Sequence, residues 1–392
     1  MRYILHVDMN SYFASVEEAE FPQYRNKPII VSGKTKRSVV ASANYLARSF
    51  GIKAAMPIYM AKRLCPRVII AIPHFNLYQT YADRFLQTIA EKFTNNIEIA
   101  SIDECYVDIT SLTKNNLMAV KIAEQIQTAI KKETGLKCSI GVANNKFLAK
   151  MGSDYKKPLG ITTMWLSEIK EKLWPQPVEN MLWVGKNSAV LLEEHGIRTI
   201  GDVAKDTNKA LLEKLLDKNW IVHYYHANGH GEDQLDYSHN QPKSIGASET
   251  FLNDTSSYEE IKDKLLELTH EVVRRLQRHK LNCKTISVSI KTPDMKLHNK
   301  SFSLNETTKD FDKIFMNVIN LYQASFFDKS VRLVGVSLSN LTDKEELVSG
   351  ELFDDAKPNI VVPANNDLET IISKVNGKLS KDIINIAKDK LK

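Results

Sequence analysis

The hydrophobic and polar positions of the first 160 residues switch between a two-residue period, typical of strands, and a helical period. In chain order the pattern predicts a strand, a helix, two strands, a helix and a strand, which is the ferredoxin-like plan. A small insert of two strands and two helices follows the first helix. The expected core strands are residues 2–8, 97–100, 105–109 and 137–142, and the expected helices are 11–20, 78–93, 117–133 and 145–155.

The remaining residues predict a short-helical region, a polar tether and a second α/β unit. This unit has expected strands at 243–250, 283–291, 300–304 and 331–339 and expected helices at 258–279 and 309–327. Along Thr285–Lys291 apolar and polar residues alternate cleanly, so one face packs on a core and the other exposes small polar side chains and a lysine. Such a face can lie along a phosphate backbone.

Carboxylates directly follow two of the apolar runs. Asp8 ends the first strand, and Asp103 and Glu104 lie between the second and third strands. Rigid strand ends that present carboxylate oxygens suit a hard cation such as Mg²⁺. Because neighbouring residues of an ideal strand point to opposite faces, the three acids converge only if the chain bends at Ile102–Cys105. The alternative is that each acid is an ordinary solvated loop residue.

Composition narrows the class of protein. A chain of 392 residues is too long for one ordinary core, and 43% hydrophobic with 26% charged residues is typical of a globular protein. The net charge of +6 is compatible with a nucleic-acid partner but is also common among metabolic enzymes. Four scattered cysteines without a CxxC pair argue against a zinc site and a disulfide framework. No apolar run approaches the roughly 20 residues of a membrane span, so we expect a cytoplasmic protein without a membrane partner.

Besides the acids, three further short segments contain residues suited to binding or catalysis. His6–Glu17 leads from a strand into a helix through a tight turn, and Ala41–Arg48 sets Tyr45 and Arg48 three residues apart on one helix face. Asn144–Lys150 opens a helix with a basic group one turn in. Together with the acids, these strings resemble the Y-family DNA polymerases, most closely the DNA polymerase IV (DinB) branch.

The resemblance implies the fold class, an α/β (α+β) multidomain chain. The palm would be ferredoxin-like with a small fingers insert, followed by a helical thumb with helix-hairpin-helix turns and a separate α/β little finger. The resemblance covers most of the chain and is strongest over residues 2–160. The implied bounds are 1–20 and 76–165 for the palm, 21–75 for the fingers, 166–232 for the thumb, 233–242 for the tether, 243–341 for the little finger and 342–392 for the tail.

The resemblance also implies the activity. The chain would be a template-directed, error-prone DNA polymerase for translesion synthesis that transfers dNTPs to a primer 3′-OH by two-metal chemistry, without proofreading. Two Mg²⁺ ions, for which Mn²⁺ can substitute, are the implied cofactor. Primer–template DNA, dNTPs and a sliding clamp are the implied partners of a monomer. The implied catalytic residues are Glu104, Asp103 and Asp8, and the same three carboxylates with the Met9 carbonyl are the implied metal ligands.

The implied nucleotide site combines cations, hydroxyls and one aromatic ring. Phe13 matches the family's steric gate, a flat ring that leaves no room for a ribose hydroxyl; the alternative for any Phe is a core position. Small residues expected around the nascent base pair imply low discrimination, and they are Ser32, Ala41 and Ser42. The implied nucleotide-binding residues are Tyr45, Arg48, Lys150, Ser42, Phe13 and Tyr12.

The DNA contacts implied by the resemblance are Gly185, Lys186, Gly196, Lys291 and Arg332. Trp183 takes a place where glycine is common in the first hairpin, so a plain helical turn is an equal alternative there. In the tail, Leu352 and Phe353 resemble the end of a clamp-binding peptide, with Ser349 where the usual opening glutamine would be. The alternative is a segment that packs on its own domain.

Two other functions compete with polymerisation. A nucleotide cyclase shares the palm plan and paired acids, but the fingers strings, the hairpins and the basic second unit disfavour it. A catalytically inert accessory protein that binds DNA or a clamp is the second alternative. The joint presence of the acids with Tyr45, Arg48 and Lys150 argues against it.

Overall fold

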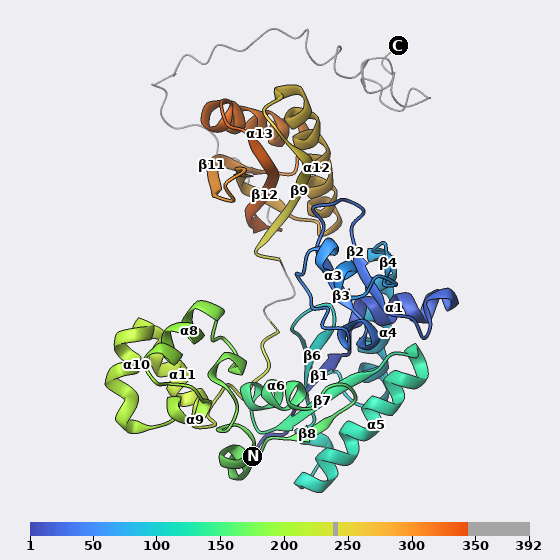
Figure 1. Ribbon diagram of the computed structural model, residues 1–392, viewed down its shortest axis with the longest axis vertical. Coiled ribbons are helices and arrows are strands. Elements are labelled where there is room, and N and C mark those ends of the chain that lie inside the picture. Colours follow the sequence, from blue (N-terminus) through green and yellow to red (C-terminus); the bar gives the residue numbers. More distant parts are fainter. Residues whose placement is uncertain (238–241, 344–392) are drawn as a thin grey trace. The chain divides into compact units, whose positions relative to one another are not determined.

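The computed structural model describes residues 1–237 and 242–343 (Figure 1). A five-stranded sheet with the order β5-β6-β1-β7-β8 organises the N-terminal region, and its central strand β1 is antiparallel to both neighbours. Four of these strands form the expected ferredoxin-like arrangement, whereas the short edge strand β8 was not expected. The strands are β1 (Ile4–Met9), β5 (Ile97–Ile99), β6 (Glu104–Asp108), β7 (Cys138–Ala143) and β8 (Ile161–Thr163).

Helices cover both faces of this sheet, so every residue of β1 is buried. Leu5, Val7 and Met9 belong to a core that includes side chains of helices α1, α4 and α5. Ile4 shares a second core with Phe147 of helix α6. Because side chains alternate along a strand, Ile4, His6 and Asp8 all face α6. The helices are α1 (Tyr12–Glu20), α4 (Phe75–Lys92), α5 (Asn116–Thr134) and α6 (Lys146–Tyr155).

The insert after α1 has a three-stranded sheet of its own, in the order β3-β2-β4. It encloses a small core that includes Ile30, Val40 and Ala47. The first two strands and both helices were expected, and the three-residue strand β4 was not. The elements are β2 (Ile29–Ser32), β3 (Val40–Ala43), α2 (Tyr45–Arg48), α3 (Ile58–Leu64) and β4 (Ile69–Ala71).

Short helices follow β8, as the sequence predicts. Their apolar residues, among them Leu192 and Leu212, share one core with α6 of the sheet region. The helices are α7 (Ile169–Lys172), α8 (Lys186–Glu194), α9 (Ile200–Val203), α10 (Lys209–Leu216) and α11 (Trp220–Ala227).

The region from residue 242 to 343 has a separate core under an antiparallel sheet in the order β11-β10-β12-β9. Ile286 and Val288 of β10 are fully buried, whereas Ser287 between them is only partly covered, which confirms the expected alternation. The elements are β9 (Ser244–Thr255), α12 (Tyr258–Arg278), β10 (Asn282–Lys291), β11 (Leu297–Thr308), α13 (Phe311–Phe326) and β12 (Val331–Thr342). In the parts of the chain that the structure describes, no helix is both long and apolar enough to cross a bilayer.

Candidate active site

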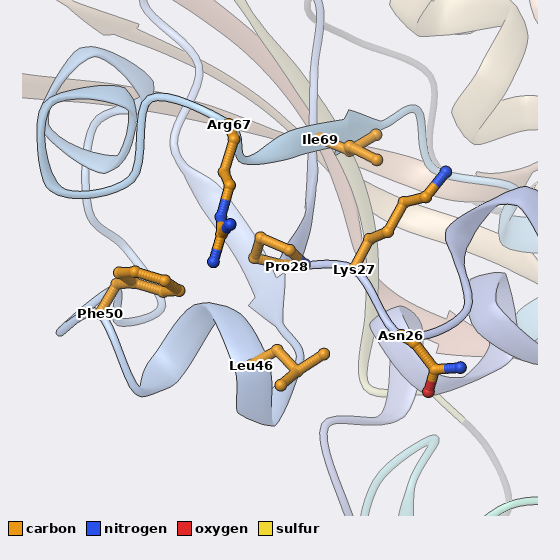
Figure 2. A pocket seen from close by; sticks show the side chains of 7 residues that line it. All are labelled: Asn26, Lys27, Pro28, Leu46, Phe50, Arg67 and Ile69. Atoms are coloured by element: carbon orange, nitrogen blue, oxygen red, sulfur yellow. The ribbon is translucent and has the colours of Figure 1, made fainter.

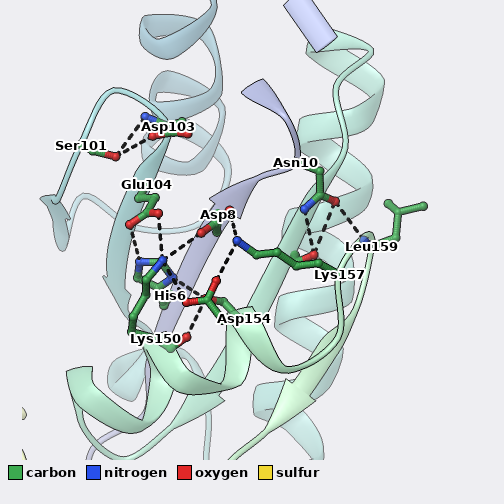
Figure 3. Close-up of polar contacts among 12 residues, drawn as sticks. His6, Asp8, Asn10, Ser101, Asp103, Glu104, Lys150, Asp154, Lys157 and Leu159 are labelled. Atoms are coloured by element: carbon green, nitrogen blue, oxygen red, sulfur yellow. Dashed lines mark hydrogen bonds and ion pairs between the residues drawn. The ribbon is translucent and has the colours of Figure 1, made fainter. Parts of the chain in front are cut away.

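Asp8 and Glu104 lie directly opposite each other on strands β1 and β6. The ammonium of Lys150, on α6, contacts Asp8 Oδ2 at 3.0 Å and Glu104 Oε1 at 2.8 Å (Figure 3). Lys150 is placed by a capped helix start, because the Asn145 side chain accepts a hydrogen bond from the backbone N–H of Leu148. One cation therefore joins carboxylates from two strands.

A second ammonium, that of Lys157, contacts the other oxygen of Asp8 at 2.7 Å. Asp154 accepts from both lysines, at 2.8 Å from Lys157 and 3.3 Å from Lys150. Lys157, which lies just after α6 beside Pro158, was not among the predicted site residues. A basic pair between a helix end and a proline was the signal that could have found it.

Burial and neighbouring charges shift the pKa values of Asp8, Glu104 and Lys150 in different directions. Burial raises the pKa of Asp8 to about 6, against the opposing influence of the two lysines. Burial also raises the pKa of Glu104, but the neighbouring His6, Asp8 and Lys150 side chains outweigh burial and hold that pKa below its ordinary value. For Lys150 burial lowers the pKa, yet the surrounding carboxylates produce a net rise. The site therefore favours bound cations.

Asp103 occupies the hairpin that joins β5 to β6. The bend expected at this place is present, because the backbone N–H groups of Ala100 and Ser101 both donate to the Glu104 carbonyl, at 3.0 and 3.1 Å. The Asp103 carboxylate accepts from Ser101 Oγ at 2.7 Å and points away from Asp8 and Glu104 (Figure 3). Across residues 1–237 and 242–343, no group of three metal-ligating side chains is gathered at one point.

The donors nevertheless fit a hard divalent cation. Asp8 and Glu104 already hold one positive charge between them, and the partly exposed Asp103 is the neighbour of Glu104 on the same hairpin. Carboxylate oxygens are the ligands that Mg²⁺ prefers.

His6 supports Glu104 from inside the sheet. Its ring is fully buried, and Nε2 lies 3.4 Å from Glu104 Oε2. Nδ1 is 2.8 Å from Ser153 Oγ, whose hydroxyl donates to the Lys150 carbonyl. Burial lowers the pKa of His6, although Glu104 opposes that shift. His6 was not among the expected site residues, since an apolar strand with one histidine reads as a core strand.

The predicted nucleotide-binding side chains of the insert lie on and beside α2. The Tyr45 hydroxyl is buried and finds no hydrogen-bond partner among the described residues, while the Arg48 guanidinium lies over the Tyr45 ring, 4.9 Å from its centroid. Ser42 is buried and its hydroxyl accepts from the backbone N–H of Ala14 at 3.4 Å. Burial raises the pKa of Tyr45. The nearby Arg48 and Lys157 oppose this rise, and Asp8 adds to it.

Phe13 stands at the start of α1 with part of its ring accessible. The ring stacks on Tyr78, with centroids 4.4 Å apart, and meets Phe75 edge-on at 6.3 Å. Tyr12 is buried, and its hydroxyl donates to the Tyr78 carbonyl. Phe13 is therefore neither a fully buried core residue nor free, but a partly exposed ring supported by its neighbours.

The predicted DNA contacts are spread over two regions. Gly185 is the N-cap of α8, Lys186 is the first residue of that helix, and Gly196 takes the left-handed conformation after it. Trp183 is 74% exposed and also left-handed, with φ of 71°. The remaining predicted contacts are Lys291, which ends β10, and Arg332, which lies in β12. Leu352 and Phe353 lie outside the described residues.

A pocket of about 330 Å³ lies on the insert, away from the acids (Figure 2). Its cationic members are Lys27 and Arg67, and the Arg67 guanidinium lies over the Phe50 ring at 5.6 Å. None of its lining residues is a predicted site residue. The candidate active site is thus the pair Asp8 and Glu104 on the inner strands β1 and β6, not this hollow.

Comparison with known proteins identifies the family. A family model described as impB/mucB/samB family matches residues 7–154, and the C-terminal domain model of that family matches residues 242–352. The chain is 37% identical to DNA polymerase IV 1 of Halalkalibacterium halodurans over 88% of this chain and 83% of that protein. It is 35% identical to DNA polymerase IV 1 of Bacillus subtilis over 98% of this chain and 92% of that protein.

Solved structures agree with this family. A Y-family DNA polymerase chimera of Dbh and Dpo4 is 26% identical with a TM-score of 0.79, over 86% of this chain and 98% of that chain. An insertion ternary complex of Dbh DNA polymerase is 27% identical with a TM-score of 0.62 and the same coverage. The sheet region, insert, short helices and C-terminal unit are accordingly palm, fingers, thumb and little finger. The chain belongs to the Y family of DNA polymerases, in the DNA polymerase IV branch, and is a metal-dependent, DNA-directed DNA polymerase of translesion synthesis.

Proposed function

We propose that the chain extends a DNA primer by error-prone, two-metal transfer of dNTPs, with Asp8, Asp103 and Glu104 as its catalytic carboxylates. The observation that carries this proposal is the Asp8–Glu104 pair, whose oxygens share one ammonium at 3.0 and 2.8 Å. Two carboxylates that already hold a cation across two rigid strands are suited to a divalent metal. The Met9 carbonyl is the proposed backbone ligand.

In the proposed reaction the primer 3′-oxygen forms a bond to the α-phosphorus of the dNTP. The bond from that phosphorus to the bridging oxygen breaks, pyrophosphate leaves with the electron pair, and the hydroxyl proton passes to solvent. Two Mg²⁺ ions, or Mn²⁺ in their place, would lower the pKa of the 3′-hydroxyl and stabilise the leaving charge. Asp8, Asp103 and Glu104 hold the ions and so fix the distance between the reacting atoms.

The triphosphate meets groups that the fold already presents. The unpartnered Tyr45 hydroxyl supplies a donor, and Arg48 supplies a fork-shaped guanidinium suited to phosphate. Lys150 and Lys157 reach the same place from α6 and the loop after it, because both contact Asp8. Ser42 and the backbone at Tyr12 are further proposed contacts.

Phe13 is the proposed steric gate. Its ring stacks on Tyr78 and the residue is partly exposed, which suits contact with a sugar C2′. Low fidelity is proposed because the residues over the nascent pair are small, namely Ser32, Ala41 and Ser42.

DNA binding is proposed for Gly185, Lys186, Gly196, Lys291 and Arg332, and the domain bounds are proposed as the sequence predicts them. We also propose that the protein acts as a monomer in the cytoplasm and that Leu352 and Phe353 bind a sliding clamp. The apolar groove of a partner could receive this pair even with Ser349 in place of glutamine.

Primer extension tests the proposal. The full chain, a primed template, dNTPs and Mg²⁺ are compared with an Asp103→Ala/Glu104→Ala protein, and DNA binding is measured in parallel. We expect distributive synthesis by the unaltered chain and none by the variant, with DNA binding retained in both. Synthesis that survives in the double variant would refute the carboxylate assignment, and tight DNA binding without any synthesis would favour the accessory function.

A further inference from the structure

Glu17 is a fully buried carboxylate that the proposed reaction does not use. It lies in α1, and its exposed fraction is 0%. Its oxygens accept a hydrogen bond from the Tyr78 hydroxyl at 2.6 Å and lie 3.0 and 3.1 Å from Nδ1 of His74. A buried carboxylate is costly unless such partners compensate it. The fold supplies Glu17 with two such polar partners, so we ask what the buried carboxylate does for its neighbours.

Tyr78, on α4, is held at two points. Its hydroxyl is bound by Glu17, and its carbonyl accepts from the hydroxyl of Tyr12. The Tyr78 side chain is itself completely buried. A tyrosine whose hydroxyl is bound to a buried carboxylate cannot swing its ring without losing that hydrogen bond in a buried place.

The Tyr78 ring is also the surface on which Phe13 rests. The two rings are stacked, with centroids 4.4 Å apart and an interplanar angle of 22°. Phe13 and Glu17 are four residues apart on α1, so they lie on the same face of that helix. The hydrogen bond and the stack thus close a ring of contacts between α1 and α4, while Phe13 itself stays partly exposed.

We propose that Glu17 is a positioning residue for sugar selection, which holds the Phe13 ring in place through Tyr78. This inference rests on the proposed role of Phe13 as steric gate. A gate must distinguish two sugars that differ by one oxygen atom, so a small retreat of the ring admits the ribonucleotide while the deoxyribonucleotide still fits. Loosening the support should therefore weaken discrimination more than it weakens synthesis.

The same pair of helices offers a matched control. One turn further along, the Tyr81 hydroxyl donates to Glu20 Oε1 at 2.7 Å, again from α4 to α1. No ring contact joins Tyr81 to Phe13 in the described residues. Tyr81→Phe removes a comparable hydrogen bond without touching the support of the gate.

The experiment measures kcat/KM for dCTP and for CTP opposite a template dG with the full chain and Mg²⁺. We expect Tyr78→Phe and Glu17→Met to lower the dCTP over CTP preference roughly three- to tenfold, the factor that one hydrogen bond is worth. Use of dCTP should change much less. Glu17→Gln keeps an acceptor for Tyr78 and should retain most of the preference, and Tyr81→Phe should retain all of it.

Phe13→Ala separates the two proposals. If it abolishes the preference while Tyr78→Phe and Glu17→Met leave it unchanged, the positioning role is wrong and the gate stands. If Phe13→Ala leaves the preference intact, the gate is wrong and the positioning role falls with it. An equal loss in Tyr81→Phe would mean general loosening of the two helices and would also overturn the inference. Thermal unfolding of each variant confirms that folded proteins are compared.

Discussion

Asp8 and Glu104 face each other across strands β1 and β6, and the ammonium of Lys150 binds both carboxylates, at 3.0 and 2.8 Å. The side chains of Lys150 and Asp8 are only 13% and 5% exposed. Solvent therefore screens this contact poorly, and the two acids depend on a cation for their stability.

Replacement of Lys150 by Met should expose that dependence. We expect the free energy of unfolding without metal to fall by roughly 2–3 kcal/mol, because two largely buried acids lose a shared partner. Added Mg²⁺ should stabilise the variant more than the unaltered chain, since the ion then replaces the missing charge. Urea unfolding with and without Mg²⁺ measures both effects.

The control is Lys92→Gln, which removes an exposed pair with Glu133 elsewhere in the palm. It should leave both the stability and the response to Mg²⁺ unchanged. Equal losses of unfolding free energy in the two variants would contradict the shared role of the Lys150 cation. A Lys150→Met protein whose stability does not rise with Mg²⁺ would contradict it as well.

Gly141 sets the distance between β7 and α6, which carries Lys150. A Cβ at Gly141 would lie within 1.8 Å of the Ala149 carbonyl oxygen and 2.5 Å of Ser153 N. Gly141→Ala should therefore push α6 off the sheet, with a loss of stability of more than about 2 kcal/mol and loss of primer extension. Gly246→Ala, where the nearest atom to a new Cβ is 3.3 Å away, should be mild. Similar unfolding midpoints for the two variants would contradict the prediction.

Two histidines of the thumb predict a pH dependence of stability. His226 stacks on Phe147 of the palm at 4.4 Å, and burial lowers the pKa of both His226 and His223 below 6.5. The unfolded chain therefore binds more protons at acid pH, so the stability that these residues contribute is full above about pH 6.5 and is lost as the pH falls below it.

His226→Phe should keep the stack and remove one titrating group. We expect the stability of the variant to fall less steeply than that of the unaltered chain between about pH 6.5 and 5, with little difference at about pH 8. Urea unfolding across this range is the measurement. Parallel curves would mean that folding does not lower the pKa of His226, and they would contradict the prediction.

Lys291 is the predicted phosphate contact at the end of β10. Lys291→Gln should weaken binding of duplex DNA by a similar factor for unrelated sequences. It should also reduce the slope of log K against log salt by about 0.9, the value for one phosphate contact. Fluorescence anisotropy at several salt concentrations measures this, with Lys92→Gln as the control. An unchanged slope would remove Lys291 from the DNA surface.

Much of the fold could be predicted because the spacing of apolar residues is clear in long strands and helices. The strand before Asp8 was expected, and so was the alternation around Ile286 and Val288 in β10. The edge strands β4 and β8 were missed because each has three residues, too few to show a period.

The site could be predicted only where its residues lie within or next to a recognisable sequence motif. The sequence predicts that Asp8, Asp103 and Glu104 converge, and the structure brings together only Asp8 and Glu104. The direction of the Asp103 side chain depends on the hairpin and on its contact with Ser101. The contact of Lys150 with both acids was not predicted, because Lys150 was expected at the triphosphate. Glu17 looked like an ordinary helix acid in the sequence. Its burial is decided by α4, more than fifty residues away along the chain, which no local pattern reveals.

The most direct test of the account is to count bound metal by electron paramagnetic resonance of Mn²⁺. The unaltered chain, with primed DNA whose primer lacks a 3′-hydroxyl and the matching dNTP, is compared with Asp8→Asn, Asp103→Asn and Glu104→Gln. We expect two Mn²⁺ ions for the unaltered chain and a loss of affinity of at least roughly tenfold in each variant. Undiminished Mn²⁺ binding in all three variants would contradict it, because the metal would then be held by other residues.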